Sequence, residues 1–135
     1  MSVSRVLAVY ALTLLTFLAC DAVWLGVVAK GLYRRELGHL LAPEVRWWAA
    51  LVFYLIYVVG VLVLVVLPGR GGSLATVAAL GALFGFVAYA TYDLTNLATL
   101  REWPLLVTAV DLVWGAVLTA ATAAAGWLYA RWLLP

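Results

Sequence analysis

The stretch from Trp47 to Gly69, WWAALVFYLIYVVGVLVLVVLPG, decides the fold, because its 23 residues include no charged side chain. About 20 consecutive apolar residues are enough for an α-helix to cross the hydrocarbon core of a bilayer. The aromatic pair Trp47-Trp48 suits the depth of the lipid headgroups, and Pro68-Gly69 is expected to end the helix. The stretch therefore predicts a transmembrane helix.

Three further segments have the length and composition of membrane spans. Two carry no charge over 22 residues (Gly71–Tyr92) and 19 residues (Leu112–Ala130), and a third, Val6–Ala29, contains Asp21 as its one charge. The third is too long for the hydrophobic region of a signal peptide, and its apolar run continues past Cys20, which argues against a lipoprotein cleavage site. We therefore predict helices at about residues 6–29, 44–67, 74–98 and 105–133.

Short connections determine how these helices are arranged. The turn from Pro68 to Gly72 is followed by Ser73, a good helix N-cap, and Arg101–Pro104 separates the last two spans. Helices joined by such short turns run antiparallel to their neighbours. The predicted fold class is therefore all-α: a polytopic membrane protein whose four transmembrane helices form an up-down bundle, as a single membrane domain over residues 1–135.

The composition excludes several classes of protein. Hydrophobic residues make up 68% of the 135 residues, against roughly 45–50% in soluble domains, so a soluble globular protein is excluded. The net charge of +2 comes from scattered Lys and Arg residues, so we expect no nucleic-acid partner. One Cys and one His are too few for a Cys-based or multi-His metal site, and the sequence has no nucleotide-binding motif. We expect no metal and no cofactor.

The longest connection, Lys30–Ala42, has an amphipathic pattern. Apolar and aromatic side chains recur in it at helical spacing, with basic side chains between them: Leu32, Tyr33, Leu37, Leu40 and Leu41 alternate with Arg34, Arg35 and His39. Such a segment lies in the membrane interface. It is either a lid over a cavity or a collar whose basic side chains reach the headgroups.

Three acidic residues fall inside predicted spans: Asp21, Asp93 and Asp111. Because consecutive helices alternate in direction, all three lie in the same half of the membrane, roughly 12–15 Å below the basic residues that flank their helices. An Asp in a membrane helix costs about 2.5–3.5 kcal/mol, so we expect all three to face the bundle interior or a wet cavity. The alternative is that they form hydrogen bonds between helices and only hold the bundle together.

Each of these acids has a Trp or Asn three positions later, which places both side chains on one helix face. Further tyrosines follow on the facing surfaces of the other spans. The predicted ligand-binding or proton-binding residues are therefore Asp21, Trp24, Asp93, Asn96, Asp111, Trp114, Tyr54, Tyr57, Tyr89 and Tyr92. The candidate charge partners of the acids are His39, Arg101, Arg34, Arg35 and Lys30.

Small residues form stripes on the last two predicted spans. Gly81 and Gly85 are four positions apart, and Gly115, Thr119 and Ala123 repeat that spacing. Such stripes let helix backbones approach closely in membranes. They predict either tight packing between the helices at about residues 74–98 and 105–133 or a homodimer formed through these faces.

Four motifs of this chain resemble those of a known family. They are Asp21-Ala-Val-Trp24-Leu25, Leu37-Gly38-His39-Leu40-Leu41, Tyr92-Asp93-Leu94-Thr95-Asn96-Leu97-Ala98-Thr99-Leu100 and Asp111-Leu-Val-Trp114-Gly115. Over nearly its whole length the chain is similar to small bacterial membrane proteins catalogued as domain of unknown function 2177. The resemblance implies a four-helix bacterial membrane protein, which we expect in the inner (plasma) membrane. It carries over no role for any residue.

Four functions are compatible with these residues. We favour the binding or carriage of a small amphipathic, cationic or lipid-like molecule in an acidic and aromatic cavity in one leaflet. The others are proton-linked transport or conduction by a dimer, lipid modification by an intramembrane enzyme with paired Asp residues, and a structural or partner-binding role. Because the sequence identifies no nucleophile, an enzyme is the less favoured class. Membrane lipids are partners in all four cases.

Overall fold

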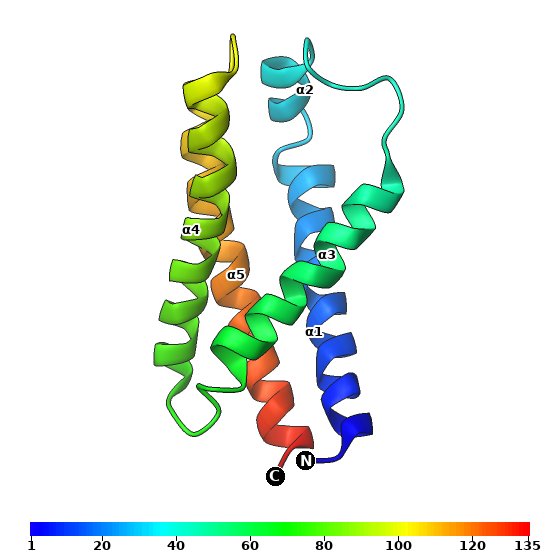
Figure 1. Cartoon of the computed structure of the whole chain (residues 1–135), viewed down its shortest axis with the longest axis vertical. Helices are drawn as coiled ribbons and strands as arrows, with labels where there is room; N and C mark the ends of the chain where they lie inside the picture. The colour runs from blue at the N-terminus through cyan, green and yellow to red at the C-terminus, as the bar shows by residue number, and fades with distance from the viewer.

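The computed structural model describes all 135 residues as an all-helical molecule with four long helices (Figure 1). They are α1 (Val3–Val23), continued by the π-helical turn η1 (Trp24–Val28); α3 (Trp47–Val61), continued by the π-helical turn η2 (Leu62–Val66); α4 (Leu74–Thr99); and α5 (Leu105–Leu133). A short helix, α2 (Leu32–Leu37), lies in the longest connection. Each of the four long helices is long and apolar enough to cross a membrane, which confirms the predicted class of four-span all-α membrane protein.

The helix ends lie close to the predicted ones, with one informative difference. Ser73 caps α4 as expected, because its hydroxyl accepts a hydrogen bond of 3.1 Å from the backbone N–H of Thr76. The helix predicted from residue 44 begins instead at Trp47. Pro43 has no backbone N–H, and the charged side chain of Glu44 remains exposed in a non-helical segment. The second membrane helix therefore starts at the tryptophan pair.

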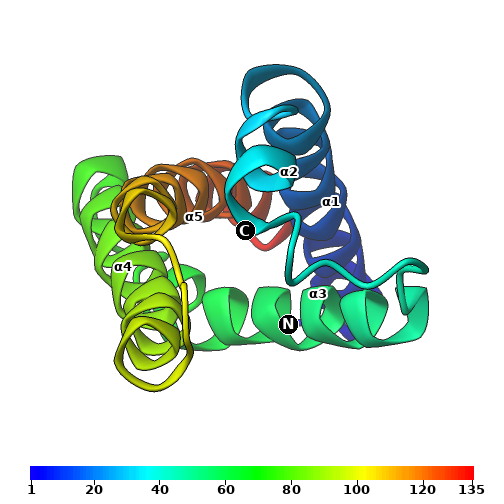
Figure 2. The same cartoon turned by 90° about the horizontal axis from the view of Figure 1, so that it is seen from above.

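Two of the membrane helices end in a π-helical turn. In each turn a backbone N–H reaches back five residues: Ala29 donates to the Trp24 carbonyl at 2.8 Å, and Leu67 donates to the Leu62 carbonyl at 2.9 Å. A π turn holds more residues than an α turn, so it changes the direction in which the following residues point. After the first of these turns, the chain continues toward the same end of the bundle (Figure 1) and forms α2, which lies beside α5 (Figure 2).

The two ends of the bundle differ in what they hold. One end carries α2, the end of α4 and the start of α5, and the opposite end carries both chain termini (Figure 1). We call these the α2 end and the terminal end. The alternation of helix directions thus places Asp21, Asp93 and Asp111 in the half nearer the α2 end, as the order of the spans predicts.

Helices α4 and α5 lie side by side along most of their length (Figures 1 and 2). Their small residues explain how close they come. A Cβ added at Gly81 would lie 2.6 Å from the Cβ of Ala123, and one added at Gly85 would overlap the carbonyl oxygen of Gly115. The predicted tight packing of these two helices is therefore present within one chain.

The same contacts correct the alternative prediction of a homodimer through these faces. Gly81 and Gly85 on α4, and Gly115, Thr119 and Ala123 on α5, are all buried in the single chain. They are buried because the two stripes face each other. The small-residue faces are therefore not available to a second copy.

The apolar core fills the half of the bundle near the terminal end. All four long helices contribute buried side chains to it, including Val9, Val58, Val77, Leu118 and Trp127. Helix α3 crosses the bundle at a steep tilt (Figures 1 and 2). It approaches α4 near this end, where a Cβ added at Gly60 would lie 3.0 Å from the ring of Phe84. Toward the α2 end the two helices diverge.

The contact between α4 and α5 can be tested with one added methyl group. Replacing Gly85 by Ala is expected to reduce stability by about 1–3 kcal/mol, because the new Cβ would overlap the Gly115 carbonyl oxygen and the Thr119 side chain. Circular dichroism measures the melting temperature of each variant in detergent. Gly26→Ala is the matched control, since a Cβ at Gly26 meets nothing within 4 Å. Equal melting temperatures for the two variants would contradict the packing described.

Candidate functional site

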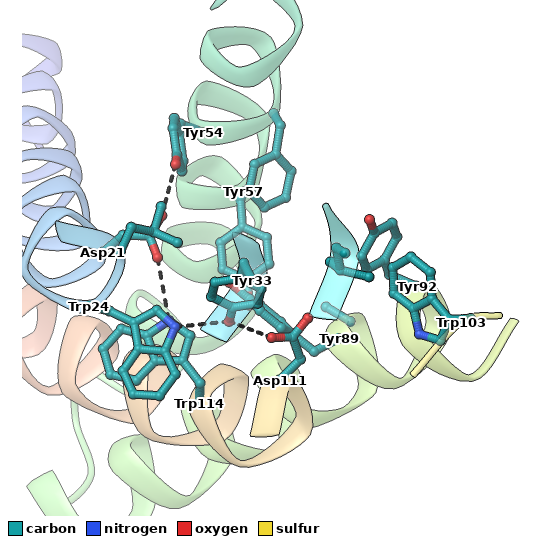
Figure 3. Close-up of a pocket in the computed structure, with 14 residues that line it drawn as sticks. Asp21, Trp24, Tyr33, Tyr54, Tyr57, Tyr89, Tyr92, Trp103, Asp111 and Trp114 are labelled. Carbon is teal, nitrogen blue, oxygen red and sulfur yellow. Dashed lines mark hydrogen bonds between the residues drawn. The ribbon is translucent and has the colours of Figure 1, made fainter. Parts of the chain in front are cut away.

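A cavity of about 630 Å³ lies in the half of the bundle near the α2 end (Figure 3). All five helices contribute to its wall, and 12 of its 14 lining residues are hydrophobic. The other two are Asp21 and Asp111. Aromatic side chains dominate the apolar wall: Trp24, Tyr33, Phe53, Tyr54, Tyr57, Tyr89, Tyr92, Trp103 and Trp114. The cavity is thus an aromatic chamber with two carboxyl groups.

Asp21, on α1, accepts hydrogen bonds from two other helices. The hydroxyl of Tyr54 on α3 donates to its Oδ2 at 2.8 Å, and the indole N–H of Trp114 on α5 donates to its Oδ1 at 3.3 Å (Figure 3). The side chain of Asp21 is nearly buried. One carboxyl group therefore ties α1, α3 and α5 together at the cavity wall.

Asp111, on α5, is held by a side chain from the interfacial helix. The hydroxyl of Tyr33 on α2 donates to its Oδ1 at 2.5 Å, and the same hydroxyl accepts a hydrogen bond of 2.9 Å from the indole N–H of Trp24. Burial, followed by the hydrogen bond to Asp111, raises the pKa of Tyr33 above its ordinary value. The phenol therefore keeps its proton at neutral pH and remains a donor.

The two hydrogen-bonded acids share a common aromatic wall. The rings of Trp24 and Trp114 are stacked, with centroids 4.4 Å apart and planes 8° from parallel (Figure 3). Trp114 donates to Asp21, and Trp24 reaches Asp111 through Tyr33. The stacked pair thus links the two networks and fixes how far apart their carboxyl groups lie.

Asp93 is placed differently from the sequence prediction. Its side chain is completely buried, and it is absent from the cavity wall. Neither of its carboxyl oxygens has a hydrogen-bond donor, and its polar neighbour is the carboxyl group of Asp111. Asp93 is one of the buried residues of α4, with Gly81 and Gly85, and it lies against Asp111 of α5 outside the cavity wall.

Eight of the ten predicted site residues line the cavity, and Asn96 joins Asp93 as the second exception. Asn96 lies one helical turn beyond Tyr92, toward the end of α4, and is half-buried outside the cavity. Tyr92 does line the cavity and packs edge-on against Trp103, at 5.6 Å between ring centroids. Asn96 was predicted because it shares a helix face with Asp93, and Asp93 itself lies outside the cavity wall.

The predicted charge partners do not reach the membrane acids. Ion pairs form only between Arg35 and Glu36 at 3.4 Å and between His39 and Glu102 at 3.9 Å, all near the α2 end. Arg34, Arg101 and Lys30, the other candidates, form no ion pair in the structure. The prediction of basic partners was wrong because α2 turns Tyr33 and Leu37 toward the cavity and leaves its basic side chains outside it. Neutral phenol and indole groups serve as the donors.

The sequence reasoning missed several residues of the wall, of which Tyr33 and Trp103 matter most. Tyr33 and Leu37 are four positions apart on α2, and this spacing could have identified the face that turns inward. Trp103 follows Glu102, whose φ of 57° is left-handed, and it is buried against Leu37 and Val107. No regular spacing predicts a residue that is positioned by such a turn.

The lining residues limit the chemistry available in the cavity. The wall contains neither serine nor cysteine, so it offers neither of the usual covalent nucleophiles. No group of three or more His, Cys, Asp or Glu side chains is arranged to hold a metal ion. The wall offers two hydrogen-bonded carboxyl groups, several phenol hydroxyls and the faces of two stacked indoles. These groups are suited to binding.

Comparisons with known proteins agree with the fold. Searches among curated proteins and among solved structures found no match. The sequence profile of a family described as "Predicted membrane protein (DUF2177)" matches residues 6–128, a range that includes the whole cavity wall. The chain therefore belongs to this family of predicted membrane proteins, the domain of unknown function 2177.

Proposed function

We propose that the protein binds, and carries within the membrane, a small amphipathic molecule with a cationic or hydrogen-bond-donating head. One observation carries the proposal: two carboxyl groups line an aromatic cavity that has no Lys, Arg or His in its wall. We place the protein in the bacterial inner membrane. The acid-bearing half has five Lys and Arg residues near it against three at the other end, which favours a cytoplasmic position for the cavity.

The charge of the site supports a cationic ligand. Asp21 and Asp111 receive hydrogen bonds only from neutral groups, namely two phenols and one indole. An ionised carboxylate has about four lone-pair positions, so each acid can still accept a further donor. A ligand with an ammonium group would supply both the missing positive charge and additional donors.

The aromatic wall supports the same choice. Electron-rich faces of Trp and Tyr attract cations by roughly 0.5–2 kcal/mol each, and the stacked pair Trp24–Trp114 lies between the two acids. The cavity volume of about 630 Å³ falls inside the range of roughly 300–1,000 Å³ that is typical of small-molecule sites. A head near the acids and an apolar tail along the wall would fill such a space.

The arrangement is less suited to a proton path through one chain. The acids are confined to the half near the α2 end, while the other half is filled by buried apolar side chains such as Val9, Val58 and Val77. A relay across the membrane needs polar groups along its whole length. The buried polar side chains of this half include Thr13 and Thr122, whose hydroxyls donate to backbone carbonyls of their own helices, and no acidic side chain continues the path.

Binding can be tested with a water-soluble probe. Hexyltrimethylammonium is expected to bind the wild-type protein in lipid nanodiscs, and Asp21→Asn and Asp111→Asn are each expected to weaken binding about tenfold, or about 1.4 kcal/mol. Isothermal titration calorimetry measures the affinities. The reason is that each substitution removes one of the two carboxyl groups that line the cavity.

Two controls accompany this experiment. Glu44→Gln removes one negative charge from an exposed residue outside the cavity and is expected to leave the affinity unchanged. The second control is an uncharged probe, in which a carbon atom replaces the nitrogen of hexyltrimethylammonium. It tests whether binding needs the positive charge. Equal affinities for both probes, or for wild type and both Asp variants, would overturn the proposal.

A second test asks whether Asp93, the membrane acid outside the cavity wall, stabilises the bundle. Asp93→Asn is expected to keep or raise the melting temperature, because it removes a carboxyl group buried beside that of Asp111 and the Asn amide can donate to Asp111. The comparison variant is Thr119→Val, which removes the 2.8 Å hydrogen bond between Thr119 and Tyr57 and should cost about 1 kcal/mol. If Asp93→Asn melts lower than Thr119→Val, Asp93 is a structural tie.

The role of α2 as the cover of the cavity gives a further prediction. Tyr33→Phe removes the donor to Asp111 and the acceptor for Trp24, so residues 32–37 should exchange amide hydrogens faster in hydrogen–deuterium exchange mass spectrometry. Tyr129→Phe is the control, since it also removes one hydroxyl hydrogen bond, to Thr16, outside the cavity wall. Unchanged exchange in the Tyr33 variant would show that α2 is held by its apolar contacts alone.

A further inference from the structure

A ligand could enter the cavity from two sides, and these sides differ in how their side chains are packed. One is the water-facing side beneath α2, and the other is the side between α3 and α4, which diverge toward the α2 end (Figure 1). The two helices meet in the other half, where Tyr57 packs edge-on against Phe84 at 5.4 Å. The first half of α3 instead packs against α1, through Tyr54 and Phe17.

Packed side chains of α2 and of the connection between α4 and α5 lie on the water-facing side. Leu37 of α2 is buried in a small cluster with Trp103 and Val107, and Tyr33 is hydrogen-bonded to Asp111. The indole N–H of Trp103 is itself bonded to the Thr108 hydroxyl at 3.1 Å. A ligand that entered from water would have to break these contacts.

The side between α3 and α4 is open. Phe53 on α3 and Tyr92 on α4 both line the cavity, yet they are 45% and 57% exposed. Phe53 lies six residues after the start of α3 at Trp47, and Tyr92 lies seven residues before the end of α4 at Thr99. At 1.5 Å per residue, Phe53 lies about 9 Å and Tyr92 about 10.5 Å along its helix from that end, so both belong to the apolar spans of α3 and α4.

The charges of the wall restrict which lipids could enter by this route. The wall holds two carboxyl groups and no basic side chain, so a phosphate group would meet only like charge. Phosphate sites in proteins use Arg, Lys or backbone N–H groups. Neither an Arg nor a Lys side chain lines this cavity. The phosphate of a phospholipid headgroup is therefore disfavoured in this cavity, whereas a single ammonium group is favoured.

We propose that the ligand is a phosphate-free long-chain amine that enters sideways from one leaflet, through the opening between Phe53 and Tyr92. This inference rests on the proposed function and narrows it to a ligand class and a route. The ammonium head lies between Asp21 and Asp111, and the alkyl chain passes Phe53 and Tyr92 into the bilayer. The ligand thus needs no movement of α2 to reach the acids.

The test uses two photoreactive probes that differ only in the head. One is tetradecylamine with a diazirine in the middle of the chain, and the other is tetradecyl phosphate with the same diazirine. After irradiation in nanodiscs, peptide mass spectrometry locates the labelled residues. The amine is expected to label Phe53 and Tyr92 at least about tenfold more than the phosphate does, and the double variant Asp21→Asn, Asp111→Asn should remove this difference.

Labelling of lipid-facing residues serves as the internal control. Ile56 on α3 and Val87 on α4 are exposed and lie outside the cavity wall, so both probes should label them equally. If the amine labels Phe53 and Tyr92 no more than the phosphate does, the lateral route is wrong. If hexyltrimethylammonium still binds in an Asp-dependent way in that case, the proposed function stands without the lateral route. If neither the photoreactive amine nor hexyltrimethylammonium binds, both proposals fail.

Discussion

A carboxyl group inside a membrane helix must find its hydrogen-bond donors in the protein, because the hydrocarbon around it supplies none. Here the donors of the two cavity acids are Tyr33, Tyr54 and Trp114, all uncharged. These bonds connect α1, α2, α3 and α5, so the acids determine how the half of the bundle near the α2 end is assembled. Since the donors carry no charge, they leave the negative charge of an ionised acid uncompensated.

The two halves of the bundle are held together by different physics. Near the terminal end, close packing of apolar and small side chains dominates, and Gly81 and Gly85 let α4 lie directly on α5. Near the α2 end, hydrogen bonds and aromatic contacts surround a space that is not filled. The steep tilt of α3 accounts for the difference between the halves. Helix α3 packs against α4 near the terminal end and diverges from α4 toward the α2 end.

Much of the fold could be predicted from the sequence, since the membrane imposes simple rules of length and polarity. Uncharged runs such as Trp47–Gly69 located the spans, and alternating helix directions placed three acids in one half. The site was harder to predict, because helical spacing identifies a face without saying which neighbour that face meets. Asp93 and Tyr92 are adjacent in sequence, yet one faces α5 and the other the cavity. The approach of Tyr33 to Asp111 depends on the π-helical turn and short connection that place α2 beside α5, which spacing does not encode.

Native mass spectrometry of the purified protein, beside the double variant Asp21→Asn, Asp111→Asn, tests most directly whether the cavity binds an amphipathic cation. We predict that the wild-type protein retains a small basic molecule, that the mass of this molecule is missing from the double variant, and that the Glu44→Gln variant retains the molecule. A spectrum in which the wild type and the double variant carry the same bound masses would contradict the assignment of the cavity as a binding site for an amphipathic cation.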